Sequence, residues 1–201
     1  MNIAEFFQKH GGISFVAIAK KIYLKLIRSN RKYEKYLREA GAKIGTDCHV
    51  LGTSFGSEPY LVEVGNNVYF SSGVKMFTHD GGTMQLYYMG ISNKKYDNFG
   101  KIKIGDNCFI GAESIILKNV TIGNNCIIGA GSVVSRSIPD GCVAAGVPAK
   151  VICTVEEYYE KNKEYYDDTV GWNSYKKRQY IESNMQKYEE RRKAFSEKYA
   201  K

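Results

Sequence analysis

The chain has 201 residues, an ordinary apolar fraction of 43% and a formal net charge of +8. This length suits one domain with appendages. The five cysteines show no paired spacing, which argues against a disulfide framework and for a reducing compartment. Nearly all of the net charge lies in residues 1–43, where ten Lys and Arg stand against three Asp and Glu. The basic character therefore belongs to one segment.

Residues 1–43 predict a basic helix with one apolar face. Lys and Arg occupy the other face, and the apolar residues recur with a period near 3.6. This stripe consists of Phe15, Ile18, Ile22, Leu26, Tyr33 and Leu37. Two interpretations stay open. The helix caps the exposed end of the structure that follows it, or docks on an anionic membrane surface, and both roles can hold together.

The same segment bears on localisation and partners. Its apolar run, residues 13–19, is too short to span a bilayer and is followed at once by two lysines. We therefore expect no signal peptide and a cytoplasmic protein, at the inner face of the membrane if the segment docks there. No nucleic-acid reading module is present, so we expect no nucleic-acid partner.

A six-residue repeat organises residues 44–139. It is clearest at 104–139, where each block opens with an aliphatic residue and has a small or aliphatic fifth residue. The openers are Ile104, Ile110, Ile116, Ile122, Ile128 and Val134. A period of six fits neither a helix nor simple strand alternation. It predicts a parallel β-helix, a triangular coil whose opener and fifth residue point inward and whose corners hold Gly and Asn at positive φ.

The repeat begins before this clear stretch. Earlier openers are Ile44, Val50, Val64, Phe70 and Met76. We expect Ser54 to point inward as the fifth residue of its block. The G-x-S-x-G match around Ser54 therefore lacks the strand–turn–helix setting of a hydrolase nucleophile. The stretch GSEPYLVE, residues 56–63, is two residues longer than a block, which indicates a protruding corner that carries Glu58.

The repeat is interrupted at residues 81–101, which predict a long loop with Gly-Gly at its root. Its aromatic residues are Tyr87, Tyr88, Tyr96 and Phe99. Long loops inside compact repeats are usually functional. His79 stands where the coil breaks into this loop. After residue 152 the repeat stops, and residues 153–201 predict helices with an aromatic stripe that packs against the coil or another subunit.

The hexads, the THDGG at 78–82 and the AGVPAK at 145–150 resemble the hexapeptide-repeat acyltransferases. Within them, the sequence is most similar to the branch that acetylates sugars, antibiotics and capsular polysaccharide. The resemblance covers residues 44–152, between the segments 1–43 and 153–201. It implies a left-handed coil, acetyl-CoA as donor, a homotrimer with active sites between subunits, and a loop that helps to wall the acceptor site. The hand comes from the resemblance alone, because parallel crossovers are normally right-handed.

His79 is the candidate general base that this resemblance implies. A sugar hydroxyl is a poor nucleophile, so its attack on a thioester needs its proton removed as the bond forms. A neutral imidazole near pH 7 can take this proton and return it to the departing thiolate. Asp80 and Glu58 are candidate acceptor contacts or partners of His79. Asp80 equally suits the start of a turn, and Glu58 equally suits an ordinary solvated acid.

The candidate donor site rests on spacing. Ala112 and Ala130 are eighteen residues apart, which is one full coil, so they stack on one edge. Their small side chains leave backbone N–H and C=O groups open to the pantetheine arm, and Gly111 widens the groove.

The closing motif supplies further donor contacts through the resemblance. It implies that Lys150 meets a CoA phosphate and that Val147 and Pro148 flank the adenine. Phe109 stands where the family often has Trp, next to the same groove.

Together these features predict an acetyl-CoA-dependent O-acetyltransferase that acts on a saccharide hydroxyl by direct transfer, in surface-polysaccharide or glycan assembly. Two alternatives remain open: an N-acyltransferase for a nucleotide-linked amino sugar, and a non-catalytic β-helix that binds a ligand. Three scattered histidines do not supply a metal site, so no metal is expected.

Overall fold

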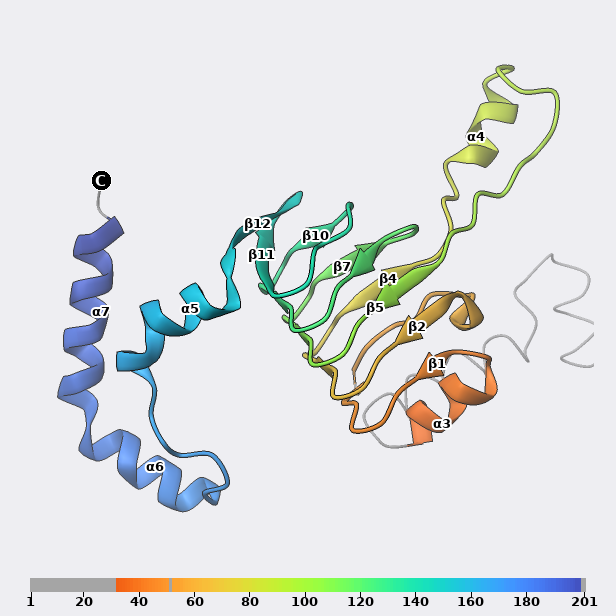
Figure 1. Ribbon diagram of the computed structural model, residues 1–201. Helices are drawn as coiled ribbons and strands as arrows, with labels where there is room; N and C mark the ends of the chain where they lie inside the picture. The colour runs from red at the N-terminus through yellow and green to blue at the C-terminus, as the bar shows by residue number, and fades with distance from the viewer. Residues whose placement is uncertain (1–31, 51, 200–201) are drawn as a thin grey trace, which may run out of the picture. The chain divides into compact units, whose positions relative to one another are not determined.

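The computed structural model describes residues 32–50 and 52–199. They form two compact units, of which the first ends at Glu156 and the second begins at Glu157. The first unit is a coil of short strands with helix α3 beside strand β1 and a long loop that carries helix α4 (Figure 1). The second unit is helical. Nowhere in the described ranges is a helix long and apolar enough to cross a membrane.

Three sheets run along the coil, and the chain visits them in turn. The first sheet contains β1 (Lys43–Ile44), β2 (Val62–Val64), β5 (Ile102–Ile104) and β8 (Thr121–Ile122). The second contains β3 (Tyr69–Phe70), β6 (Phe109–Ile110), β9 (Ile127–Ile128), β11 (Cys142–Gly146) and β12 (Ala149–Thr154). The third contains β4 (Lys75–Phe77), β7 (Ile115–Leu117) and β10 (Val133–Val134). All pairs are parallel except the closing hairpin of β11 and β12.

The register confirms the six-residue repeat. Ile104 pairs with Ile122, so one coil takes eighteen residues, or three blocks. The six openers from Ile104 to Val134 are each at most 1% exposed. Their fifth residues are buried beside them, including two serines and two cysteines. This double column of inward side chains is the core, and each coil completes the burial of its neighbours.

The prediction for Ser54 is wrong. Ser54 pairs with Lys75, which turns it outward and buries Thr53 and Phe55 on either side of it. The block that opens at Val50 therefore has five residues. The next block, from Phe55, is longer and includes the short helix η1 (Pro59–Leu61).

One set of corners, between the first and second sheets, is closed by side chains. We call it the polar corner; its stacked residues are Asn66, Asp106, Asn124 and Asp140. The backbone N–H of Asn66 donates to Asp106 Oδ1 at 2.6 Å, that of Asp106 to Asn124 Oδ1 at 2.9 Å, and that of Asn124 to Asp140 Oδ1 at 3.0 Å. The residue that follows adopts positive φ, as predicted, with values of 53° at Asn67 and 55° at Asn107.

Helix α3 (Lys32–Glu39) packs on the first coil. Tyr33 and Leu37 are buried and join the coil's hydrophobic core. Arg38 of the same helix donates to the carbonyls of Ile44 and Gly45. These contacts fit the capping interpretation for the end of the basic segment. The rest of the predicted stripe, from Phe15 to Leu26, lies outside the described residues.

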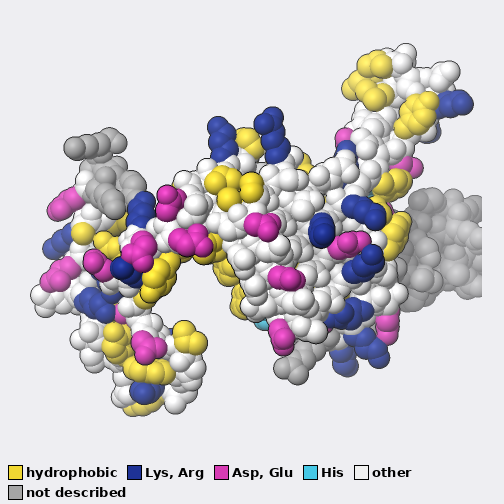
Figure 2. All heavy atoms as spheres, viewed as in Figure 1, with side chains coloured by type: hydrophobic (Ala, Val, Ile, Leu, Met, Phe, Trp, Pro, Cys, Tyr) yellow, Lys and Arg dark blue, Asp and Glu magenta, His cyan; other side chains and the backbone are white. Residues whose placement is uncertain are grey.

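The interrupting loop leaves the coil after β4 and returns at β5. It contains helix α4 (Thr83–Tyr88), whose residues all keep substantial solvent exposure. Figure 2 shows hydrophobic side chains gathered on this loop, whereas Lys, Arg, Asp and Glu are scattered over the visible face of the coil. The exposed apolar side chains of the loop include Met84, Leu86, Tyr87, Tyr88, Met89 and Ile91.

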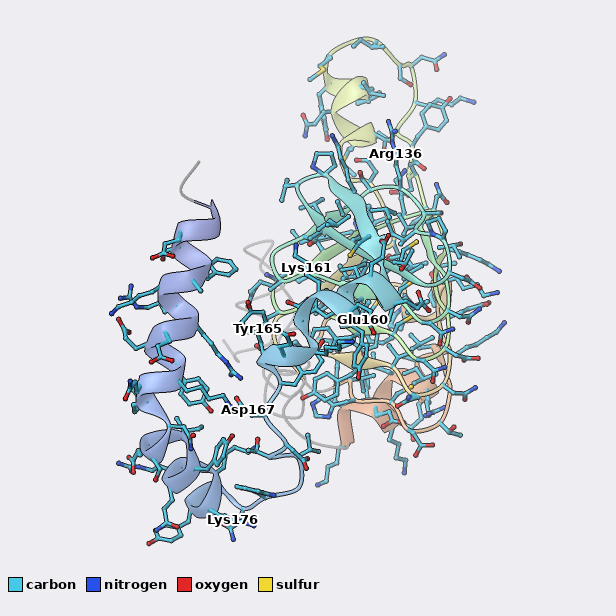
Figure 3. All side chains as sticks on the ribbon, turned by 60° about the vertical axis from the view of Figure 1, so that its left-hand side comes forward. Arg136, Glu160, Lys161, Tyr165, Asp167 and Lys176 are labelled. Atoms are coloured by element: carbon cyan, nitrogen blue, oxygen red, sulfur yellow. The ribbon has the colours of Figure 1, made fainter. Side chains whose placement is uncertain are left out.

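The second unit is organised around Asp167. It contains α6 (Ser174–Ser183), α7 (Met185–Tyr199) and most of α5 (Val155–Asn162), which is followed by η2 (Lys163–Tyr165). Asp167 lies on the segment that joins α5 to α6 (Figure 3). It accepts hydrogen bonds from Lys187 at 2.6 Å and from Tyr188 at 3.0 Å, both on α7. These bonds fix the segment against α7 and hold the pKa of Asp167 at about 2.

Candidate active site

His79 lies at the edge of the third sheet, where the chain leaves the coil. It forms an antiparallel bridge with Phe99, and the Gly100 N–H donates to the Thr78 carbonyl at 2.8 Å. The outgoing and returning strands of the loop are therefore tied together at His79. The side chain is 41% exposed, so it remains accessible to a ligand.

A carboxylate orients this imidazole. His79 Nδ1 lies 3.0 Å from Glu58 Oε2, and the same oxygen accepts a hydrogen bond from Thr78 Oγ1 at 2.6 Å. Burial raises the pKa of Glu58, but the hydrogen bonds from Thr78 and His79 outweigh this effect and hold the pKa below its ordinary value. Glu58 is therefore ionised at neutral pH and accepts a hydrogen bond from Nδ1–H, which leaves Nε2 as the basic nitrogen.

Local structure places Glu58 at this point. It follows the buried Phe55 and precedes the buried Pro59, which opens helix η1. Proline suits the first position of a helix because its φ is already fixed there. The lengthened block thus turns Glu58 back toward His79. Of the three roles expected for Glu58, which are acceptor contact, partner of His79 and solvated acid, its contact with His79 fits the second.

Asp80 has a different environment. Its carboxylate accepts the Gly82 N–H at 2.9 Å, which closes the turn that begins the loop. Asp80 also lines a pocket of about 530 Å³ that includes His79. The other lining residues are Phe77, Gly81, Leu117, Lys118 and Ser135. The third sheet thus forms the floor of a pocket with an imidazole at its edge.

Ala112 and Ala130 stack on adjacent coils, as the eighteen-residue spacing predicted. The Gly131 N–H donates to the Ala112 carbonyl at 2.7 Å across the two coils. We call these two residues the alanine corner. No residue of the described ranges accepts a hydrogen bond from the backbone N–H of Ala112 or of Ala130. These donors suit the carbonyl groups of an extended amide-bearing chain.

The stacking of the coils requires glycine at position 111. Gly111 is buried, and a Cβ there would lie 2.4 Å from the Ala130 nitrogen. The residue must therefore be glycine for the coils to stack. Phe109 lies on the outer face of the second sheet, with its ring 5.8 Å from that of Tyr69.

The AGVPAK motif forms the turn of the closing hairpin. Ala145 pairs with Lys150 and Gly146 with Ala149, so Val147 and Pro148 occupy the tip. Val147 is 72% exposed, and Lys150 is exposed as well. These three candidate donor contacts lie together at the turn end of the closing hairpin.

The candidate residues fall into separate groups. Glu58, His79 and Asp80 lie after the strands of the third sheet, whereas Ala112 and Ala130 lie before them. Thr78 is a residue of this site that the sequence did not single out. Its signal was present in the THDGG motif, but a buried threonine there looks like one more inward residue of the coil. Among the described residues, no cluster of three His, Cys, Asp or Glu side chains is arranged to hold a metal ion.

Comparison with known proteins identifies relatives of this chain. Residues 101–136 match the family model of the bacterial transferase hexapeptide, described as six repeats. Protein CapG of Staphylococcus aureus is 46% identical over 179 residues, which cover 86% of this chain and 98% of CapG.

Two solved structures share the fold at a TM-score of 0.50. A galactoside acetyltransferase in complex with coenzyme A is 26% identical, over 68% of this chain and 76% of that one. A hexapeptide-repeat acetyltransferase of Vibrio cholerae is 18% identical, over 68% of this chain and 89% of that one.

Proposed function

The chain belongs to the hexapeptide-repeat acyltransferase family, and from this membership we propose that it transfers an acetyl group from acetyl-CoA to a saccharide hydroxyl. The similarity to a galactoside acetyltransferase solved with coenzyme A supports both the donor and the class of acceptor. Family membership also implies the left-handed sense of the coil. The acceptor would belong to surface-polysaccharide or glycan assembly.

The orientation of His79 carries this proposal. With Glu58 on Nδ1, the free Nε2 accepts the proton of the acceptor hydroxyl while its oxygen attacks the thioester carbonyl. The C–S bond of the resulting tetrahedral intermediate then breaks. His79 returns the proton to the departing sulfur, so that the products are an acetyl ester and the free thiol of CoA. No acyl-enzyme is formed, and the imidazole ends the cycle neutral.

The alanine corner fits the donor. The pantetheine arm of CoA is extended and contains two amides, whose carbonyl oxygens need hydrogen-bond donors once water is removed. The unpaired N–H groups of Ala112 and Ala130 supply them from adjacent coils. Lys150, with Val147 and Pro148 beside it, would meet the phosphate and adenine end.

The separation of the two groups supports a site shared between subunits of a homotrimer. His79 and the alanine corner lie at opposite ends of the strands of the third sheet. A thioester held along the alanine corner of one copy would therefore react at the His79 of its neighbour. Closed cyclic symmetry repeats this contact three times.

The acceptor is identified by incubating the protein with isotopically labelled acetyl-CoA and a panel of saccharides and glycan extracts, followed by mass spectrometry. We expect one saccharide class to gain a labelled acetyl ester that mild base removes. Label in a base-stable amide would instead support N-acylation. No transfer to any saccharide, with the protein folded and CoA bound, would contradict the proposal.

The shared site is tested by unfolding and refolding two impaired variants together, His79→Ala and Ala130→Phe, and assaying them at an acetyl-CoA concentration far below KM, where each variant alone is only weakly active. Mixed trimers would contain some sites with both an intact His79 and an intact alanine corner. Random mixing predicts about a quarter of the wild-type activity. No recovery from verified mixed trimers would mean that each site is built from one subunit.

A further inference from the structure

Thr78 is the most completely buried polar residue near the proposed active site. Its side chain is fully buried, and its hydroxyl donates to Glu58 Oε2 at 2.6 Å. A buried hydroxyl must find a hydrogen-bond partner, and most partners of such groups are backbone carbonyls. Here the partner is a side-chain carboxylate that in turn contacts the imidazole of His79.

We propose that Thr78 is a positioning residue, which fixes Glu58 Oε2 so that the proton of His79 stays on Nδ1 and Nε2 faces the pocket. Both hydrogen bonds converge on one carboxylate oxygen, at 2.6 Å from Thr78 Oγ1 and 3.0 Å from His79 Nδ1. An oxygen held from two directions cannot swing away from the ring. The catalytic consequence rests on the proposed function, whereas the effect on the imidazole proton does not.

The backbone leaves room for this contact. Gly56 has a φ of +70°, and a Cβ there would approach both Thr78 Oγ1 and the Met76 carbonyl oxygen to 3.0 Å. A side chain at position 56 would therefore press on the hydroxyl. The absence of one leaves Thr78 free to reach Glu58. Ser57 Oγ adds a longer contact to His79 Nδ1, at 3.4 Å.

Thr53 shows what a buried threonine does when it only fills the coil. It is also fully buried, and its hydroxyl donates to the Val50 carbonyl at 2.6 Å. The hydroxyls of Thr53 and Thr78 thus have the same burial and the same hydrogen-bond length. They differ in the acceptor, which is a backbone carbonyl for Thr53 and the Glu58 carboxylate for Thr78. Thr53 is therefore the matched control.

The kinetic experiment compares Thr78→Val, Thr78→Ser and Thr53→Val. Valine keeps the shape of threonine and removes the hydroxyl, whereas serine keeps the hydroxyl. We expect Thr78→Val to lower kcat about tenfold or more with little change in KM for acetyl-CoA, and Thr78→Ser and Thr53→Val to stay near wild type. If Thr78→Val melts earlier than Thr53→Val, Thr78→Ala replaces it. A wild-type kcat in Thr78→Val or in its replacement Thr78→Ala, which lack the hydroxyl of residue 78, would overturn the proposal.

A second readout needs no turnover. The ¹⁵N chemical shifts of the His79 ring in the full-length protein report which nitrogen carries the proton in the neutral form. We expect the Nδ1–H form in the wild type, in Thr78→Ser and in Thr53→Val, and a mixture of both forms in Thr78→Val. The same Nδ1–H population in Thr78→Val would overturn the proposal even if kcat fell. A shift in this population without acetyl transfer by any of the proteins would uphold the positioning role while the proposed function failed.

Discussion

The polar corner and the alanine corner have the same place in the repeat and opposite chemistry. At the polar corner, each backbone N–H of Asn66, Asp106 and Asn124 is bound by the side-chain oxygen of the next coil. At the alanine corner, the corresponding N–H groups of Ala112 and Ala130 have no partner within the described chain. A corner that only holds the coil together saturates its backbone. A corner with unpaired N–H groups keeps donors that a ligand can bind.

The largest expected effect comes from His79, which lies at neither corner but where the chain leaves the third sheet. His79→Ala removes the proposed base, and we expect kcat to fall by roughly two to four orders of magnitude while CoA affinity is kept. Steady-state kinetics and CoA titration measure the two quantities. His49→Ala is the control, because that ring stacks on Tyr69 at 4.4 Å, away from the pocket. Equal turnover by wild type and His79→Ala would remove His79 from the mechanism.

Blocking the alanine corner should give the next largest effect. The phenyl ring of Ala130→Phe would cover the free N–H groups, and we expect KM for acetyl-CoA to rise about tenfold or more. The same substitution at the polar corner, Asn66→Phe, provides the control, because Asn66 lies at a different corner and two coils before Ala130. A wild-type KM in a folded Ala130→Phe protein would show that the donor does not run along this edge.

Opening the polar corner should affect stability and leave catalysis intact. Asp106→Ala takes the acceptor away from the Asn66 N–H, and we expect a loss of about 1 kcal/mol of unfolding free energy. Thermal unfolding and the KM for acetyl-CoA are measured on the same sample. A changed KM with unchanged stability would reverse the roles that we assign to the two corners.

The smallest expected effect is a pH dependence confined to the polar corner. Hydrogen bonds from the Asn124 side chain and backbone hold the pKa of Asp140 below its ordinary value of 3.8. A carboxyl whose folded pKa is depressed stabilises the fold above its unfolded pKa, and this contribution is lost as the pH falls through the folded pKa. Asp140→Asn should therefore flatten the fall in melting temperature below about pH 4. If the melting temperature of Asp140→Asn falls below this pH as steeply as that of the wild type, the prediction is wrong.

Much of the coil could be predicted from the sequence because burial follows a fixed period. The openers, the corner Asn residues at positive φ and the stacking of Ala112 on Ala130 all follow from counting six or eighteen residues. Ser54 was misplaced because its block lacks one residue and the next block makes up for it. Counting six residues cannot show that one block is shorter and the next one longer. The pairing of Ser54 with Lys75 does show it.

The active-site details depended on contacts that no period contains. Glu58 and Thr78 are twenty residues apart and meet only because the lengthened block turns back toward His79. The sequence predicted Glu58 and His79 as site residues. It could not show whether Glu58 is a partner of the imidazole or a solvated acid. The free N–H groups at the alanine corner likewise required the structure, since an absent acceptor is visible only once every neighbour is placed.

The most direct test of the comparison between corners is a crystal structure of the protein with CoA. We expect the pantetheine arm along the alanine corner, with its carbonyl oxygens within hydrogen-bond distance of the Ala112 and Ala130 nitrogens and its thiol facing His79 of the neighbouring copy. The polar corner should remain closed by its own side chains. CoA bound elsewhere on the coil, with the Ala112 and Ala130 nitrogens still exposed to water, would contradict the account.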